Sequence, residues 1–174
     1  WHDAPAGDVT PLATRPPVAA PPGYEHHADK QLTQTHVVFG APIVPHADER
    51  RYVLSLLSMV LGGGMSSRLF QRVREELGLA YAVHTFQSFH VDGGAHGVYV
   101  ASAPETARKA TEAITEELAR LAGEGLPDDE LAAAKRQLRG QVTLSMESVT
   151  NAMYRAAGQG LYGDPYRPLD DVLA

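Results

Sequence analysis

The spacing of apolar and polar residues predicts a strand and then a helix near the start of the chain. Residues 33–44 are rich in β-branched and apolar side chains, which is typical of a strand. Residues 48–61 place apolar side chains at α-helical spacing, and Asp48 and Glu49 stand where the helix dipole stabilises negative charge. The apolar stripe is formed by Tyr52, Val53, Leu56, Leu57, Val60 and Leu61. This pattern indicates a helix that ends at Gly62.

The same spacing rules predict a hairpin and two further helices downstream. Residues 81–90 and 95–102 are strand-like runs separated by the turn sequence Val-Asp-Gly-Gly, so we expect them to pair as a β-hairpin. Residues 104–121 repeat apolar side chains at helical spacing. A last helix is predicted from residue 127 to about residue 157, with Gly140 as an irregularity within it.

The stretch from Leu61 to Tyr81, between these elements, reads LGGGMSSRLFQRVREELGLAY. Its three glycines break the preceding helix, because glycine accepts backbone conformations that other residues avoid. A new helix is expected to begin at Ser66 or Ser67, either of which can cap its first turn, and to end at Gly78. The apolar positions of this helix are Leu69, Phe70, Val73 and Leu77.

Among the arginines of this helix, Arg74 is expected to lie at the boundary of the core. At about 100° per residue, the apolar face is centred between Leu69 and Phe70, which places Arg74 at its margin. The same geometry points Arg68 and Arg72 further into solvent.

Tyr81 opens the next strand, so the spacing allows Arg74 and Tyr81 to project near one another. Taken alone, an arginine at a helix edge and a tyrosine in a strand are more often structural. Their chemistry permits a second role, because a guanidinium and a phenol both donate hydrogen bonds to a peptide carbonyl or a developing oxyanion. Spacing alone leaves both interpretations open.

The chain divides into a predicted linker, residues 1–29, and a predicted domain, residues 30–174. Six of the twelve prolines lie within the first 23 residues, and such a sequence favours extended backbone that cannot build a core. The strands and helices of the domain predict an α+β fold, with a mixed, mostly antiparallel sheet and helices packed on one face.

Composition narrows the classes of function. The net charge of −6 argues against general nucleic-acid binding, and no apolar run is long enough to cross a membrane. The sequence has no cysteine, which excludes disulfides, thiolate metal sites and a cysteine nucleophile but leaves the compartment open. The chain begins at Trp1 and has no basic-then-apolar leader, so we expect a piece of a longer protein with a cytoplasmic location.

The eight histidines do not form a metal-binding pattern. None of the spacings H-x-x-E-H, H-x-x-x-H or H-x-H occurs among them, so we expect no metal site within this chain. No residue of the chain is expected to be catalytic by itself.

Three other features have simpler structural interpretations. The glycines at 62–64 precede a helix but lack the lysine of a P-loop and the spacing of a dinucleotide fingerprint. Ser66 and Ser67 do not lie in a G-x-S-x-G motif, which favours capping over nucleophilic attack. A solvated helix surface is expected at the charged residues Glu112, Glu116, Glu117 and Arg120.

The stretch LGGGMSSRLFQRVREELGLAY resembles the signature of one half of the pitrilysin and mitochondrial processing peptidase group of zinc peptidases, namely the carboxy-terminal, non-zinc half. The segments SAPETARKA, LPDDELAAAKRQLRGQ and MYRAAGQGLYGD support the resemblance, which covers about residues 30–173. It implies repeated α+β domains that enclose a chamber, with zinc held by an H-x-x-E-H motif of the amino-terminal domain. That motif is absent from this chain.

For this half, the resemblance implies an arginine and a tyrosine, seven residues apart, that bind substrate near the scissile bond; here they are Arg74 and Tyr81. It also implies zinc in the intact enzyme, a partner amino-terminal zinc-binding domain, peptide substrates, and a homo- or heterodimer. The expected function is the substrate-binding, chamber-closing half of a zinc-dependent metalloendopeptidase, inactive alone. The implied reaction is attack of zinc-bound hydroxide on a peptide carbonyl.

A second hypothesis belongs to another class, because some members of the group have lost the zinc site and serve as structural or regulatory subunits. The presence of both Arg74 and Tyr81 favours the enzyme. The group's half-subunit also continues past a segment like LDDVLA into a further helix and a closing strand, so we expect the domain to be incomplete here.

Overall fold

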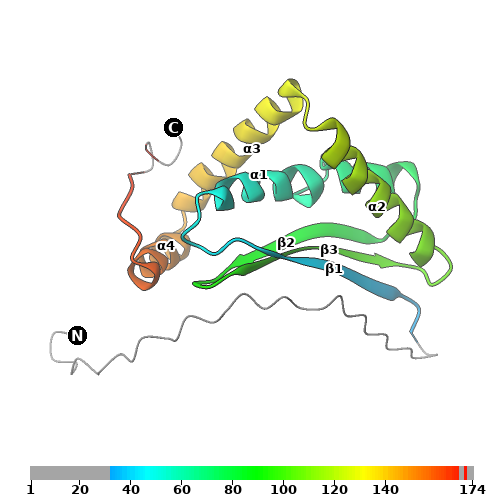
Figure 1. Cartoon of the computed structure of the whole chain (residues 1–174), viewed down its shortest axis with the longest axis horizontal. Coiled ribbons are helices and arrows are strands. Elements are labelled where there is room, and N and C mark those ends of the chain that lie inside the picture. Colours follow the sequence, from blue (N-terminus) through cyan, green and yellow to red (C-terminus); the bar gives the residue numbers. More distant parts are fainter. Residues whose placement is uncertain (1–31, 169–170, 172–174) are drawn as a thin grey trace.

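Three strands form one antiparallel sheet, in which β3 lies between β1 and β2 (Figure 1). The computed structural model describes residues 32–168 and 171, so the predicted linker of residues 1–29 lies outside the described residues. The elements, in chain order, are β1 (Thr35–Ile43), α1 (Arg50–Gly62), η1 (Phe70–Glu76), β2 (Ala82–Phe89), β3 (Gly94–Ser102), α2 (Ala107–Glu124), α3 (Asp128–Met146) and α4 (Val149–Tyr162). This arrangement confirms the predicted α+β class, and both strand pairings in the described part are antiparallel.

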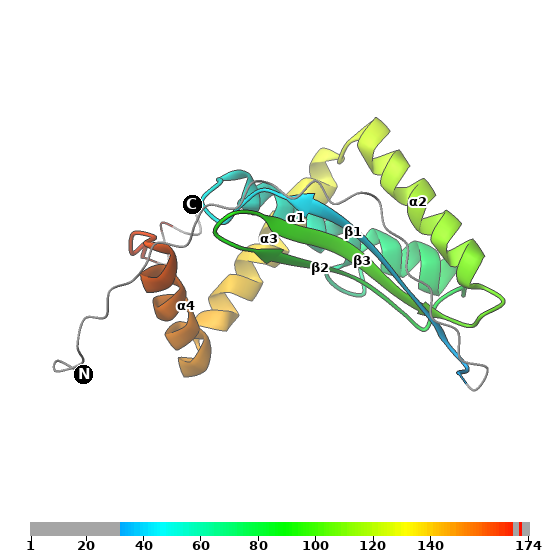
Figure 2. The same cartoon turned by 60° about the horizontal axis from the view of Figure 1, so that its bottom comes forward.

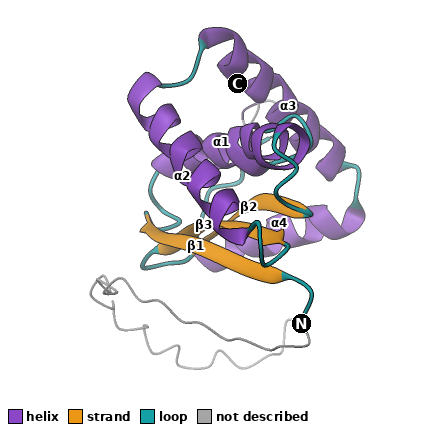
Figure 3. Ribbon diagram, turned by 90° about the vertical axis from the view of Figure 1, so that its right-hand side faces the viewer, coloured by secondary structure: helices purple, strands orange, loops and turns teal. Residues whose placement is uncertain are grey.

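The helices α1, α2 and α3 lie over one face of the sheet, as Figure 3 shows. Figure 2 shows the three strands side by side, with α4 beyond the end of the sheet where the β2–β3 hairpin turns. The predicted hairpin is confirmed, because β2 and β3 pair from Ala82–Ala101 to Phe89–Gly94. The fold therefore leaves the opposite face of the sheet without a helix in the described part of the chain.

The hydrophobic core lies where α1, η1 and α2 meet the covered face of the sheet. It is formed by Leu61, Leu69, Val73, Val83, Val98, Val100, Ala110, Ala113 and Ile114. Leu69 and Val73 are completely buried, and burying one such side chain contributes roughly 2 kcal/mol. The first turns of η1 are thus fixed by the core.

The first turn of α1 is capped by Asp48. The carboxylate of Asp48 accepts the backbone N–H of Arg50 at 2.9 Å, which satisfies one of the free donors of the first turn. Hydrogen bonds from Arg50 lower the pKa of Asp48 to about 2. The predicted apolar stripe holds only in the second half of this helix, because Tyr52 and Val53 are exposed.

The predicted last helix is two helices in the structure, so the prediction of one continuous helix with an irregularity at Gly140 is wrong. The chain is helical through Gly140 and breaks instead between Met146 and Val149. The side chain of Ser148 accepts the N–H of Asn151 at 3.3 Å and so begins α4. Serine competes for backbone donors in this way at helix starts, and the local hydrogen bond decides where the break falls.

Candidate functional site: an exposed arginine and tyrosine

η1 is a π-helix, which is wider than the α-helix that the sequence predicts. The N–H of Leu77 donates to the carbonyl of Arg72, five residues earlier, at 3.2 Å. π-Helical turns are rare in proteins as a whole, but those that occur are often found at functional sites. The helix ends before Gly78, as predicted, and the φ angle of Gly78 is 61°, a conformation that glycine adopts without strain.

The predicted serine cap of this helix is wrong. Among the described residues, no side-chain oxygen caps η1, and the hydroxyl of Ser67 donates to the carbonyl of Gly64 at 2.6 Å instead. Ser67 therefore stabilises the turn that follows α1 rather than the first turn of η1.

Arg74 lies on the last turn of η1 with 45% of its side chain exposed. Its guanidinium lies over the ring of Phe70, 4.7 Å from the ring centroid, which orients the side chain by a cation–π contact. Its Nε is 3.7 Å from the carboxylate of Glu75, a distance too long for a hydrogen bond. The N–H groups of Arg74 thus remain available to a hydrogen-bond acceptor.

Tyr81 precedes β2 and is 56% exposed. Its backbone N–H donates to the carbonyl of Ala101 at 2.8 Å, while Ala101 is also the register partner of Ala82. The backbone of Tyr81 is therefore held to β3 just before the regular pairing of β2 begins. The start of β2 is held by the sheet while the phenol is left in solvent.

No hydrogen bond joins Arg74 to Tyr81 within the described residues, and neither side chain donates to another described residue. Both are exposed and lie on the two segments that flank Gly78. Each can donate to an external acceptor such as a peptide carbonyl.

Arg68 does not point into solvent, and the prediction that it does is wrong. Only 15% of its side chain is exposed. Its Nε donates to Oε1 of Glu130 at 2.8 Å and its Nη2 to Oε2 of the same carboxylate at 2.5 Å, which is a bidentate pair with α3. Its Nη1 donates to Glu117 of α2 at 3.3 Å. The hydrogen bonds to Glu130 raise the pKa of Arg68.

Glu117 was expected on the solvated face of its helix, and this prediction is also wrong. The residue is 3% exposed and lies on the buried side of α2. Arg120 neutralises it further, since its Nη2 donates to Oε2 of Glu117 at 2.5 Å. The sequence contained one signal for this burial: Glu117 stands three residues after Ile114 and seven after Ala110, which is the spacing of the buried face.

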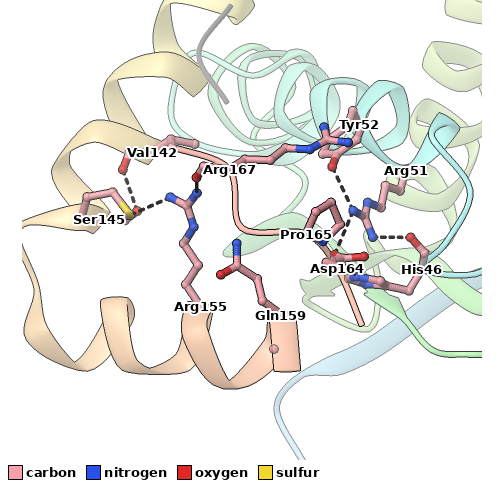
Figure 4. Close-up of a pocket in the computed structure, with 12 residues that line it drawn as sticks. His46, Arg51, Tyr52, Val142, Ser145, Arg155, Gln159, Asp164, Pro165 and Arg167 are labelled. Carbon is pink, nitrogen blue, oxygen red and sulfur yellow. Dashed lines mark hydrogen bonds and ion pairs between the residues drawn. The ribbon is translucent and has the colours of Figure 1, made fainter. Parts of the chain in front are cut away.

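A pocket of about 360 Å³ lies between α1, α3, α4 and residues 164–167 (Figure 4). Asp164 accepts hydrogen bonds from Nε2 of His46 at 2.8 Å and from Nη2 of Arg51 at 3.2 Å. The hydrogen bond from His46 lowers the pKa of Asp164, and the positive charge of Arg51 acts in the same direction. These contacts join segments more than a hundred residues apart and fix the end of α4 beside α1.

The described residues do not offer a zinc site. No group of three or more His, Cys, Asp or Glu side chains in residues 32–168 lies close enough to hold a metal ion. Glu117, the one buried carboxylate among the described residues, is already paired with Arg68 and Arg120.

An α+β domain with this three-stranded antiparallel sheet, which presents an arginine and a tyrosine to solvent, fits the class of non-metal domains of zinc peptidases. The chain belongs to the peptidase M16 inactive domain family, whose model matches residues 3–138. This confirms the resemblance drawn from the stretch that ends at Tyr81.

Curated relatives carry the name zinc protease. One from Streptomyces coelicolor is 38% identical over 172 residues, which is 99% of this chain and 37% of the relative. One from Bacillus subtilis is 37% identical over 144 residues, which is 83% of this chain and 35% of the relative. The chain thus spans about a third of the length of the relatives it matches.

Solved structures share the fold. A peptidase M16 inactive domain from Pseudomonas fluorescens superposes with a TM-score of 0.73 at 26% identity, covering 80% of this chain and 34% of that one. A chain of complex III2 from Candida albicans gives a TM-score of 0.72 at 16% identity, covering 83% of this chain and 37% of that one, a likeness of fold alone. In residues 32–168, no helix is both long and apolar enough to span a membrane.

Proposed function

We propose that this domain is the substrate-binding, chamber-closing half of a zinc-dependent metalloendopeptidase and is inactive by itself. The observation that carries the proposal is the exposure of Arg74 and Tyr81, whose side chains donate no hydrogen bond to another described residue, on the two segments that flank Gly78. A guanidinium and a phenol so placed hold a peptide carbonyl and the negative charge that develops on its oxygen. Arg74 contributes more than Tyr81 to the stabilisation of this negative charge, because the interaction of its positive charge strengthens as the carbonyl oxygen becomes anionic.

The partner in this proposal is an amino-terminal zinc-binding half, together with a peptide substrate and a second copy or homologue of the chain. The name zinc protease carried by the relatives supports it, as does the finding that this chain spans about a third of their length. In this proposal zinc is held by that other half; the described residues here show no group of His, Cys, Asp or Glu side chains that could hold a metal ion. The domain's own contribution is binding and orientation.

Substitution of Arg74 tests the proposal in the full-length protein. Arg74→Ala is expected to lower kcat/KM for peptide hydrolysis about 100-fold, because one donor to a developing oxyanion contributes on that scale. Arg72→Ala is the matched control: it removes an arginine of the same helix with the same exposed fraction, 45%, whose guanidinium is paired with Glu76. We expect this control to change kcat/KM by less than about twofold.

Tyr81→Phe removes only the hydroxyl and is expected to lower kcat/KM about tenfold, which corresponds to one hydrogen bond. Tyr154→Phe removes the hydroxyl of another exposed tyrosine, on α4, and is the matched control. If Arg74→Ala changed kcat/KM no more than Arg72→Ala, and Tyr81→Phe no more than Tyr154→Phe, then Arg74 and Tyr81 would not bind the substrate. A full-length wild-type protein without peptidase activity would favour the alternative, a structural or regulatory subunit.

A further inference from the structure

We propose that Arg68 is a positioning residue that sets the orientation of Arg74 by locking the start of η1 to α2 and α3. This inference rests on the proposed function of Arg74. Arg68 touches neither Arg74 nor Tyr81 by hydrogen bond in the described structure; its partners are the carboxylates of Glu117 and Glu130.

The guanidinium of Arg68 connects the start of η1 to two other helices. Three nitrogens of one guanidinium donate to two carboxylates that belong to two different helices, at 2.8, 2.5 and 3.3 Å. The site is partly shielded from water, because the side chains of Arg68, Glu117 and Glu130 are 15%, 3% and 32% exposed. Ion pairs shielded from water in this way resist screening by salt, and the fork of the guanidinium fixes direction as well as distance.

The next step is the connection from Arg68 to Arg74. Leu69 and Val73 are completely buried, so η1 cannot shift toward the sheet. Phe70 stands two residues after Arg68, and its ring supports the guanidinium of Arg74 at 4.7 Å. A rotation of the first turn of η1 would move that ring and the arginine on it together.

The π-helix η1 needs support from neighbouring elements, and the ion pairs of Arg68 supply it at the start of the helix. A π-helix is rare because its hydrogen-bond ring is wider than that of the α-helix, so its geometry depends on the surroundings. The end of η1 is held by two hydrogen bonds: the N–H of Leu79 donates to the carbonyl of Val73 at 2.9 Å, and the side-chain hydroxyl of Thr106 donates to the carbonyl of Leu79 at 3.0 Å. The side chain of Arg68 provides the corresponding hold at the start.

Arg68→Lys is the test substitution, because it keeps the charge and removes the fork. Arg120→Lys is the matched control: Arg120 pairs with the same Glu117, but from the same helix, so its bond does not connect elements. Peptide hydrolysis by the full-length protein is measured for each variant, for Arg74→Ala and for the double variant Arg68→Lys with Arg74→Ala. Hydrogen exchange of the Leu77 and Leu79 amides, whose bonds close η1, reports the helix directly.

We expect Arg68→Lys to lower kcat/KM about tenfold, by misplacing Arg74, and to accelerate exchange at Leu77 and Leu79. On the Arg74→Ala background the same substitution should change kcat/KM by less than about twofold, because the group it positions is gone. Arg120→Lys should leave both measurements unchanged.

Losses that multiply in the double variant would overturn the inference, since Arg68 would then act independently of Arg74. Equal losses in Arg68→Lys and Arg120→Lys would also overturn it, because charge balance at Glu117 and not the link between elements would matter. Lost activity with unchanged exchange would show that Arg68 does not hold η1. An Arg74→Ala variant with unchanged kcat/KM would instead contradict the proposed function, and the inference would fall with it.

Discussion

At the scale of single residues, a charged or polar side chain can be buried at low cost in free energy when it has a hydrogen-bond or ion-pair partner. The buried carboxylate of Glu117 is paired with the partly buried guanidinium of Arg68, whereas His96 is partly buried on β3 without a partner for its Nε2 among the described residues. Burial lowers the pKa of His96, because the charged imidazolium would lose water without gaining an acceptor. His96 is therefore neutral in the folded domain at neutral pH.

The protonation of His96 predicts a pH dependence of stability. An unfolded histidine takes up its proton near pH 6.5, and the lowered pKa in the fold means that the unfolded state is protonated first. The free energy of unfolding should fall as the pH drops from about 6.5 toward the folded pKa, and should not change from this cause above that window. Urea unfolding at pH 7.5 and 5.5 measures the difference.

The variant His96→Gln should show a smaller loss of stability between those two pH values than the wild type. His90→Gln, which changes an exposed histidine at the hairpin turn, is the control. Identical pH dependence in wild type and His96→Gln would contradict this assignment.

At the scale of elements, local hydrogen bonds and core contacts settle what hydrophobic spacing leaves open. The positions of β1, α1, the hairpin and α2 follow from the spacing of apolar residues, within a few residues at each end. The break between α3 and α4 does not, because the hydrophobic pattern continues across it and the side chain of Ser148 sets it.

Substitutions in α3 and α4 should therefore have opposite signs. Ser148→Ala is expected to lower the free energy of unfolding by about 1 kcal/mol, since it removes the cap of α4. Gly140→Ala should raise it by about 0.5–1 kcal/mol, because Gly140 lies inside a regular helix and an added Cβ meets nothing within 4 Å. Denaturant unfolding checks both, and a destabilising Gly140→Ala would mean that this glycine has a role the fold does not show.

In the candidate site too, the spacing of residues along the sequence predicted some features, whereas contacts between distant segments decided others. The sequence located Arg74 and Tyr81 because each lies next to a boundary that glycine or hydrophobic spacing marks. It missed the partners of Arg68, which lie 49 and 62 residues away, because no local pattern encodes a contact over that distance. The sequence pattern also did not predict that η1 is a π-helix, since this winding depends on how Leu69 and Val73 are held in the core.

At the scale of the whole molecule, the described part of the sheet ends in two free edges. Among the described strands, β1 and β2 each pair only with β3, and the face away from the helices carries exposed apolar side chains such as Val38 and Phe86. An uncovered edge strand offers its N–H and C=O groups to another chain. A sheet of this kind favours association.

We expect this chain of 174 residues to self-associate with rising concentration, as measured by size-exclusion chromatography with light scattering. Val38→Lys, which places a charge on edge strand β1, should weaken the association. Val149→Lys places the same charge on an exposed valine of α4, away from the sheet, and should have no effect. A monomer at high concentration would argue against an uncovered edge.

By itself, the sequence determined the α+β class, most of the elements, and the positions of Arg74 at the end of a helix and Tyr81 at the entry of a strand, because apolar periodicity and glycine act over a few neighbouring residues. Only the tertiary structure decided which charges are buried, where the last helix divides, and that Arg74 stands on a π-helix joined to α2 and α3 through Arg68. The reason is physical: the free energy of these features comes from contacts between segments that are distant in the chain, and such contacts exist only in the fold.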